Sequence, residues 1–514
     1  MTIYVRPLLA LCLGLLAACG GAGPSGSLNK PVQASLEPSR WVVRRNPDAP
    51  VVELRVVFEA GSADDPAGLE GLTYVTARSM LEGRAGGLSF AERTQRLFPM
   101  AAALDLSVER EQVVFAGRVH RDHLAAFYPL YRDVLRAPAF DAADFERVRT
   151  RALAHLTQDL RGADDETLGK EVLQAMLFEG HPYAHPELGT ERGLAALQVE
   201  QLAAQWARVF CAARVRVAAS GPLDVAFEQQ LAADLASLRA ATCEAQRPLP
   251  PPSSLTTRRV WIVDKPEAAS VAMSLGVPLE VTRTHPDYAA LTLAAAYLGQ
   301  HRTFAGRLMQ KMRGDRGLNY GDYAYAEHFV QADQTRFPAP NVARRQQLFS
   351  IWIRPVQPEN AHFALRMAVR ELEQLVQEGL SQADFERMQR FAANYFALFA
   401  QTEQQRLGHV LDDRFYGATE PYLESLRKRF LALTRDEVNA AIKRHVAPSR
   451  LQIALVAPKA AALAEALVRG EPSPITYNVE KPQAVLDEDK QIAVHPLALA
   501  KEQVNLIPLA SVFR

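Results

Sequence analysis

The stretch that decides the fold is FEAGSADDPAGLEGLTYVTARSMLEG, residues 58–83. The segment leading into it, Val52 to Phe58, largely alternates apolar and charged side chains, which is the period of a strand with one buried face. After the Gly-Ser pair, Leu69 to Leu81 has the pattern of a helix. This succession predicts a sheet with helices on one face and therefore an α+β layer architecture.

The chain carries an internal duplication, which bears directly on its fold. Three pairs of segments recur in the same order. They are VVFAGRV from Val113 and LFSIWIR from Leu348, ADFER at 143–147 and 383–387, and EQLAAQWARVFCAARVRVAASG from Glu200 and DEVNAAIKRHVAPSRLQIALVA from Asp436. We therefore expect two homologous domains, each repeating a sheet with helices packed on it.

The boundary between the two halves is a proline-rich segment. RPLPPPSS, within 247–256, holds four prolines, so it predicts a stiff extended linker. One domain is expected at 36–246 and the other at 257–470. The remainder, 471–514, is expected to be an extended tail over the second domain, with short apolar pieces such as Val504 to Leu509.

The N-terminus has the features of an exported lipoprotein. The apolar run Leu8 to Leu16 is too short to span a bilayer and fits a signal peptide at 1–19. It ends in LAAC, which resembles a bacterial lipobox with Cys19 as the acylated residue, and Gly20 resembles the class sorted to the outer membrane. Residues 20–35 then predict a flexible tether. The expected location is the periplasm, lipid-anchored to the outer membrane. An ordinary signal peptide with an incidental cysteine is the alternative.

Besides Cys19, two cysteines would remain after export, Cys211 and Cys243, and they would lie in a compartment where disulfides persist. A strand-like run, Val215 to Ala219, and a helix-like run, Val225 to Leu238, separate them. An antiparallel strand and helix return the chain to its starting end, so the two thiols could meet in a disulfide. Two buried free thiols are the alternative.

The charge balance excludes some classes of function. Lysine plus arginine equals aspartate plus glutamate, 58 each, so nothing indicates binding to nucleic acid. No Gly-rich phosphate loop and no G-x-S-x-G elbow occurs. His181 and His185 flank Pro182 and so are not a helical pair; we interpret them as structural.

Three stretches carry a resemblance to a known family. They are residues 58–83, HPYAHPELGT from His181 and MRGDRGLNYG from Met312. The chain resembles the insulinase, pitrilysin and mitochondrial processing peptidase family of zinc metallopeptidases over roughly residues 40–510. In that family a helix bears H-x-x-E-H, whose two histidines hold zinc and whose glutamate takes a proton from the metal-bound water.

This sequence lacks the residues that the zinc chemistry needs. Aligned on Gly71-Leu72, the histidine positions hold Tyr74 and Arg78, the general-base position holds Ala77, and the distal ligand position falls at His155. A guanidinium has no lone pair for a cation, a methyl group accepts no proton, and tyrosine ligates only as a phenolate, from a pKa of about 10. The resemblance therefore implies no catalytic residue, metal or cofactor in this chain.

A second motif of the family is retained. Arg313 and Tyr320 match an arginine–tyrosine pair that binds substrate in the family; a surface arginine and a core tyrosine are the alternative. The resemblance implies a non-catalytic, substrate-binding subunit of a periplasmic zinc peptidase, in a heterodimer with a homologous chain that carries zinc and H-x-x-E-H and acts on peptides. The rival interpretations are a structural or peptide-binding scaffold without a proteolytic role, and a hydrolase that uses unrecognised residues.

Overall fold

The computed structural model describes residues 40–238, 243–332 and 334–514. The predicted signal peptide, Cys19 and the whole predicted tether, 20–35, lie outside the described residues. Of the helices within the described ranges, none is both long enough and apolar enough to cross a membrane.

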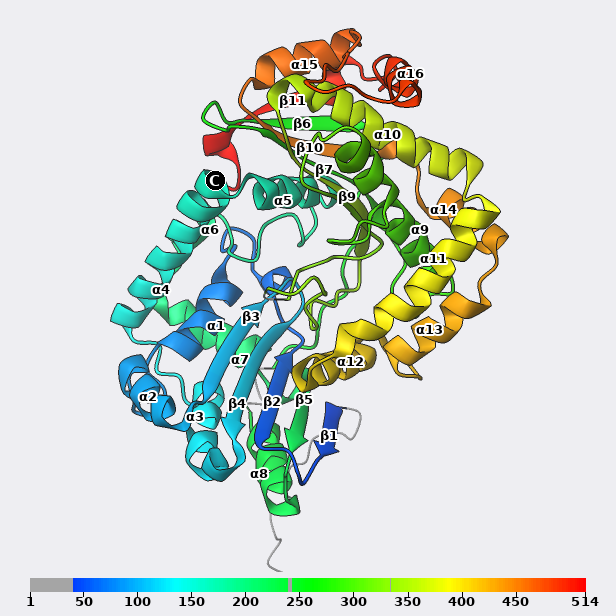
Figure 1. Ribbon diagram of the computed structural model, residues 1–514. Helices are drawn as coiled ribbons and strands as arrows, with labels where there is room; N and C mark the ends of the chain where they lie inside the picture. The colour runs from blue at the N-terminus through cyan, green and yellow to red at the C-terminus, as the bar shows by residue number, and fades with distance from the viewer. Residues whose placement is uncertain (1–39, 239–242, 333) are drawn as a thin grey trace, which may run out of the picture. The chain divides into compact units, whose positions relative to one another are not determined.

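The first half forms a five-stranded sheet in the order β1-β5-β2-β4-β3 (Figure 1). Its strands are β1 (Trp41–Arg45), β2 (Val51–Phe58), β3 (Ala103–Val108), β4 (Val113–His120) and β5 (Val215–Gly221). Its helices are α1 (Leu72–Glu82), α2 (Phe90–Leu97), α3 (Leu124–Arg136), α4 (Ala142–Ala154), α5 (Asp165–Leu177), α6 (Glu191–Ala196), α7 (Val199–Val209) and α8 (Val225–Ala236).

The second half forms a six-stranded sheet in the order β11-β6-β10-β7-β9-β8. Its strands are β6 (Arg259–Asp264), β7 (Val271–Leu279), β8 (Asp322–Tyr325), β9 (Gln347–Val356), β10 (Gln452–Ala457) and β11 (Val504–Pro508). Its helices are α9 (Tyr288–Gly299), α10 (Ala361–Glu378), α11 (Gln382–Tyr395), α12 (Glu403–Tyr416), α13 (Tyr422–Ala432), α14 (Arg435–His445), α15 (Ala460–Arg469) and α16 (Gln483–Ile492).

The duplication seen in the sequence is present in the topology. The order β6-β10-β7-β9-β8 repeats β1-β5-β2-β4-β3 strand for strand. The three matched segment pairs fall in equivalent elements, namely β4 and β9, α4 and α11, and the units α7–β5 and α14–β10. The predicted α+β class with two homologous halves is confirmed.

Strand β2 shows how the alternating sequence sets the two faces of the first sheet. Val52, Leu54 and Val56 are buried in one apolar core with residues of α1 and α3. Glu53 and Arg55 lie on the opposite face, where they line a cavity. The polar side chains of β2 therefore lie on this face of the sheet.

Each half contributes one helix that packs on the sheet of the other half. The sequence did not indicate this arrangement. Helix α5 of the first half packs on β7 and β10 of the second sheet, and helix α12 of the second half packs on β2 and β5 of the first (Figure 1). Leu407 and Leu411 of α12 join Val57 and Ala218 in a small core. The expectation of helices on one face only was wrong, because each sheet is also covered by a helix from the other half.

The C-terminal segment is more ordered than the extended tail that was expected. It contains α16, and its apolar piece becomes strand β11, parallel to β6 at the edge of the sheet. Near its end, the Phe513 carbonyl accepts the backbone N–H of Glu191 in the first half. The tail thus joins elements from both halves. The linker 247–256 contains no helix or strand.

Candidate functional site

Helix α1, which bears the altered metal motif, is held in place by the stretch that precedes it. The Asp65 carboxylate accepts the backbone N–H groups of Gly71 and Thr73, both at 2.7 Å, and the Thr73 hydroxyl at 2.6 Å. These bonds satisfy N–H groups that a helix start leaves without partners. Burial raises the pKa of Asp65 to about 6, against the opposing effects of His185 and these hydrogen bonds.

The glycines of this stretch permit close backbone approaches. Gly61 lies against the Glu109 carbonyl, where a Cβ atom would approach to 2.2 Å. Gly71 has a φ of 106° and lies against Leu188 and Gly189 of the HPYAHPELGT stretch. Two of the stretches that carry the family resemblance therefore pack on each other and fix the start of α1.

The structure brings three of the four altered zinc-site positions together. Tyr74, Arg78 and His155 line one cavity of about 130 Å³, with Glu82 and Arg151 beside them. Ala77 is fully buried in the core of the first half and does not line this cavity. His155 begins a π-helical segment, His155–Ala163, and its Nδ1 lies beside Asp159.

The residues at this position do not fit a zinc ion. The Arg78 guanidinium lies over the Tyr74 ring, 5.4 Å from its centroid, and forms an ion pair of 3.5 Å with Glu82. A permanently protonated guanidinium repels a dication and offers it no lone pair. His155 supplies the one nitrogen ligand, and the Glu82 carboxylate in the same cavity is engaged by arginines, so the ligands of a zinc site are not assembled.

Glu82 is the residue that the sequence analysis missed at this position. Its buried carboxylate is 2.6 Å from Arg151 and 3.5 Å from Arg147, both on α4, as well as 3.5 Å from Arg78. The negative charge of Glu82 is thus neutralised by three arginines, at a position where a metal ion would otherwise supply the positive charge. The four-residue spacing of Arg147 and Arg151 indicated that both side chains lie on one helix face. The sequence did not indicate that this face would contact Glu82.

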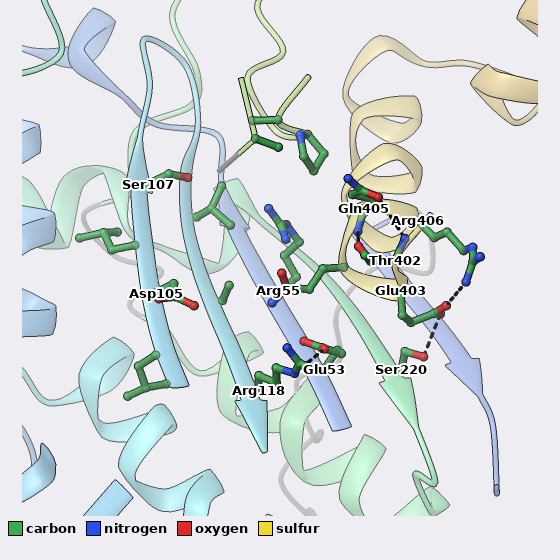
Figure 2. Close-up of a pocket in the computed structure, with 18 of the residues that line it drawn as sticks. Glu53, Arg55, Asp105, Ser107, Arg118, Ser220, Thr402, Glu403, Gln405 and Arg406 are labelled. Atoms are coloured by element: carbon green, nitrogen blue, oxygen red, sulfur yellow. Dashed lines mark hydrogen bonds and ion pairs between the residues drawn. The ribbon is translucent and has the colours of Figure 1, made fainter. Parts of the chain in front are cut away.

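A much larger cavity, of about 990 Å³, lies on the polar face of the first sheet. Figure 2 shows its labelled side chains coming from β2, β3, β4 and β5 on one side and from the start of α12 on the other. Arg118 pairs with Glu53 at 3.2 Å, and Ser220 donates to Glu403 at 2.9 Å. Burial raises the pKa of Glu53 more than Arg118 lowers it. The cavity is polar and of mixed charge, unlike the mostly apolar pockets of small-molecule sites.

The large cavity and the altered metal position share a wall. Arg78 lines both cavities. Strand β3, whose residues Leu104 to Ser107 also line the large cavity, pairs with β4 and with no other strand among the described residues. A strand edge of this kind presents backbone donors and acceptors to an incoming chain. The arrangement suits an extended peptide held next to Arg78.

Arg313 and Tyr320 contact each other but line neither of these cavities. The Arg313 guanidinium lies 4.3 Å from the Tyr320 ring centroid and 5.0 Å from that of Phe304, and it donates to the Tyr320 carbonyl at 3.2 Å. Tyr320 is 68% exposed and Phe304 is 69% exposed. The tyrosine is therefore not a core residue, and the three side chains form an exposed aromatic–cationic cluster.

Cys211 and Cys243 form a disulfide, with their Cα atoms 5.8 Å apart. The strand β5 and the helix α8 lie between them in the chain, in the succession that the sequence indicated.

Another group of potential metal ligands among the described residues is His285, Asp287 and His445, whose ligand atoms lie within 4.8 Å of one another. His285 Nδ1 accepts the Asp287 backbone N–H, so in the neutral ring Nε2 carries the proton and has no lone pair to offer. Arg444 also pairs with the Asp287 carboxylate. We interpret this group as an ion-pair cluster.

Two family profiles match the chain consecutively. The family described as Insulinase (Peptidase family M16) matches residues 40–191, and the one described as Peptidase M16 inactive domain matches residues 196–391.

Among curated relatives, the non-peptidase homologue YmxG of Helicobacter pylori is 21% identical over 426 residues, covering 80% of this chain and 90% of that protein. Among solved structures, a peptidase M16 inactive domain from Pseudomonas fluorescens aligns with a TM-score of 0.70 and 23% identity, covering 82% of this chain and 95% of that one. A chain of complex III from Candida albicans aligns with a TM-score of 0.62 and 16% identity, covering 81% and 93%. These structures show the same fold.

Proposed function

Because the chain belongs to the insulinase family, peptidase family M16, we propose that it is a non-catalytic, peptide-binding subunit that acts with a zinc-bearing homologue in peptide hydrolysis. The observation that carries this proposal is the position of Arg78. Its guanidinium lines both the large cavity and the altered metal position. A peptide in the large cavity would therefore meet a cation where a metal-bound water would be needed.

The peptide would bind as an added strand. The edge of β3 offers backbone hydrogen bonds, which give affinity without demanding a particular sequence. Glu53, Arg118 and Glu403 supply charged groups of both signs to the other walls of the same cavity. The cavity is thus suited to holding a polar main chain.

The partner would supply the metal and the general base. In this proposal the exposed cluster of Phe304, Arg313 and Tyr320 contacts peptide close to the partner's zinc. Tyrosine and arginine are, with tryptophan, the side chains most enriched at the energetic centres of interfaces.

We also propose export and lipid anchoring through Cys19. The Cys211–Cys243 disulfide supports an oxidising compartment. Labelling with a fatty-acid analogue is expected to tag the wild type and not Cys19→Ser. Label retained by the variant would contradict the anchor.

The decisive experiment uses the full chain tagged and purified from its native host. A co-purifying homologue with an intact H-x-x-E-H is expected. The two chains, separately purified and mixed, should cleave fluorescein-labelled unfolded casein, and neither should do so alone. Metal analysis should find no tightly bound zinc in this chain after dialysis. Cleavage by this chain alone, or about one zinc per chain, would overturn the proposal.

A scaffold without a proteolytic role is the second candidate, and one observation favours it. The Arg313 guanidinium is already engaged by two rings and a carbonyl of its own chain, as in a purely structural cluster. The fold likeness to a chain of complex III accords with a role in assembly. A stable complex with a homologue that is inactive on every peptide tried would favour the scaffold.

A further inference from the structure

A second cavity, separate from the altered metal position, lies between α5 and β9. Its volume is about 280 Å³, and its lining includes Lys170 of α5, Trp352 of β9, and His301 and Phe329. The Phe329 and Trp352 rings are bridged by Tyr325, whose ring centroid lies 4.4 Å from each. The His301 ring lies 4.7 Å from Phe329. One wall of the cavity is therefore aromatic, and the rest of the lining mixes aliphatic and polar side chains, among them Leu173, Glu171 and Gln174.

Lys170 is a cation with no hydrogen-bond acceptor. Its Nζ lies 3.7 Å from the Trp352 ring centroid, and no hydrogen bond or ion pair joins it to any other residue that the structure describes. Lys170 is half-buried, and burial lowers its pKa, as expected for an ammonium group partly removed from water. An ammonium group has three donors, and here the protein satisfies them only with a ring face.

The acidic residues near Lys170 are already engaged. Glu166 bonds to Arg354 at 2.9 Å, and Glu171 pairs with Arg110 at 2.8 Å. The Asp164 carboxylate caps α5 by accepting the Thr167 backbone N–H at 2.9 Å. Their charges are thus partly neutralised, and none of them contacts Nζ.

Neither of the two histidines in the wall, His301 and His328, adds a second cation, and burial holds the pKa of His328 well below its usual value. His301 contacts the Tyr325 hydroxyl through Nδ1 and Gln331 through Nε2. Burial lowers the pKa of His301 to about 4, so the ring is neutral near pH 7. The cavity therefore places one ammonium group that has no acceptor within the protein beside an aromatic wall, which is complementary to a carboxylate attached to an apolar group.

We infer that this cavity binds the C-terminal residue of a peptide, with the terminal carboxylate on Lys170 Nζ and an apolar or aromatic side chain against Trp352 and Phe329. The inference rests on the proposed peptide-binding role. Val330 and Gln331 line both this cavity and the large one, so the two cavities adjoin, and in this inference the peptide runs from the large cavity into this one. At about 280 Å³ the space is at the lower limit of ligand pockets and suits one residue.

The test compares two fluorescein-labelled decapeptides of one sequence ending in phenylalanine, one with a free C-terminal carboxylate and one amidated. N-acetyl-L-phenylalanine and its amide serve as small-molecule probes of the same chemistry. Binding to the full chain is measured by fluorescence anisotropy for the peptides and by calorimetry for the small probes. The wild type should bind the free-acid peptide about tenfold or more tightly than the amidated one, as for a charge-assisted hydrogen bond.

Variants locate the preference. Lys170→Met should abolish the difference between acid and amide, and Lys170→Arg should keep part of it. Lys443→Met, which neutralises an exposed lysine on α14, is the matched control and should keep all of it. Trp352→Leu should weaken binding of both peptides. Thermal melting checks that each variant is folded, and the wild-type comparison of acid with amide needs no variant.

The outcomes separate this inference from the proposed function. Equal binding of both peptides by the wild type, or a preference that survives Lys170→Met, would overturn the inference and leave peptide binding intact. Binding of N-acetyl-L-phenylalanine in a Lys170-dependent way, with no binding of either peptide, would identify a site for small free acids. That result would overturn both the peptide-end assignment and the proposed function.

Discussion

The Arg78 guanidinium lies over the Tyr74 ring, 5.4 Å from its centroid, so the residues at the two histidine positions of the family motif contact each other directly. In the family motif the side chains at these two positions bind a metal ion, whereas here they form a cation–π contact with each other. Such a contact is worth roughly 0.5–1 kcal/mol at exposed sites. The helix α1 thereby keeps its packing without an ion.

Ala77→Glu restores the general-base residue of the motif, and we expect it to destabilise the fold. Ala77 is fully buried in the core of the first half, and burying a carboxylate there should lower the free energy of unfolding by about 1–3 kcal/mol or more. Arg78→His, at a side chain that is 31% exposed, should cost about 1 kcal/mol or less. Urea unfolding of the two variants checks this. Equal stability of Ala77→Glu and wild type would show that space and solvent remain beside the altered site.

Arg313→Ala should reduce the peptidase activity of the reconstituted complex about ten- to a hundredfold, because a hydrogen bond from a charged donor is worth about 1.5–3 kcal/mol. Tyr320→Phe keeps the ring under Arg313 and removes only a neutral hydroxyl, so its effect should be smaller. Both variants should still assemble, as gel filtration would show. Arg435→Ala, at an exposed arginine paired with Asp436, is the control. Full activity of both variants in an assembled complex would favour the scaffold.

Loss of the Cys211–Cys243 disulfide should lower the free energy of unfolding by about 3–4 kcal/mol, because the bond closes a loop with a sequence separation of 32. The double variant Cys211→Ala, Cys243→Ala and the wild type treated with reductant should unfold at the same urea concentration. An unchanged midpoint in both would contradict a stabilising role for the bond.

Asp322 should make stability depend on pH. Burial raises the pKa of its carboxyl to about 8, against the opposing hydrogen bond from Asn319, whereas the pKa is about 3.9 in the unfolded chain. The folded state therefore binds the proton more tightly, and the resulting stability, present below about pH 4, is lost as the pH rises towards 8. The slope is at most about 1.4 kcal/mol per pH unit.

Asp322→Asn should remove this slope, so wild type and variant should diverge in urea midpoint between pH 6 and pH 8, with the variant the more stable at pH 8. Asp315→Asn, at a side chain that is 49% exposed, is the control and should follow the wild type. Parallel pH profiles for wild type and Asp322→Asn would show that Asp322 is ionised in the folded protein at neutral pH.

The chemistry of individual side chains and the local periodicity could be predicted without the structure. Alternation along β2 assigned Val52 and Glu53 to opposite faces, and the recurrence of ADFER identified α4 and α11 as equivalent. The failure of Arg78 as a metal ligand is a property of the guanidinium itself. These inferences held because they depend on bonding and on short-range geometry.

Partners between distant segments could not be predicted in this way. An amphipathic pattern tells which face of α5 or α12 is apolar but not which sheet will cover it, and here each helix covers the sheet of the other half. Nor did the pattern of residues Val504–Pro508 show that this segment would pair with β6 as an edge strand. The hydrogen bonds between strands join backbone groups and depend little on the side chains.

The sequence by itself determined that this is a duplicated α+β chain whose metal motif holds a tyrosine, an alanine and an arginine in place of the ligands and the base. Only the tertiary structure decided that Arg78 would line two cavities and that Glu82 would pair with three arginines. It also decided that Lys170 would lie against the Trp352 ring without a hydrogen-bond acceptor from the protein. The physical reason is that ligand competence depends on the lone pairs of one residue, whereas the place and charge environment of a cavity depend on segments that are far apart in the chain and meet only when the apolar cores close.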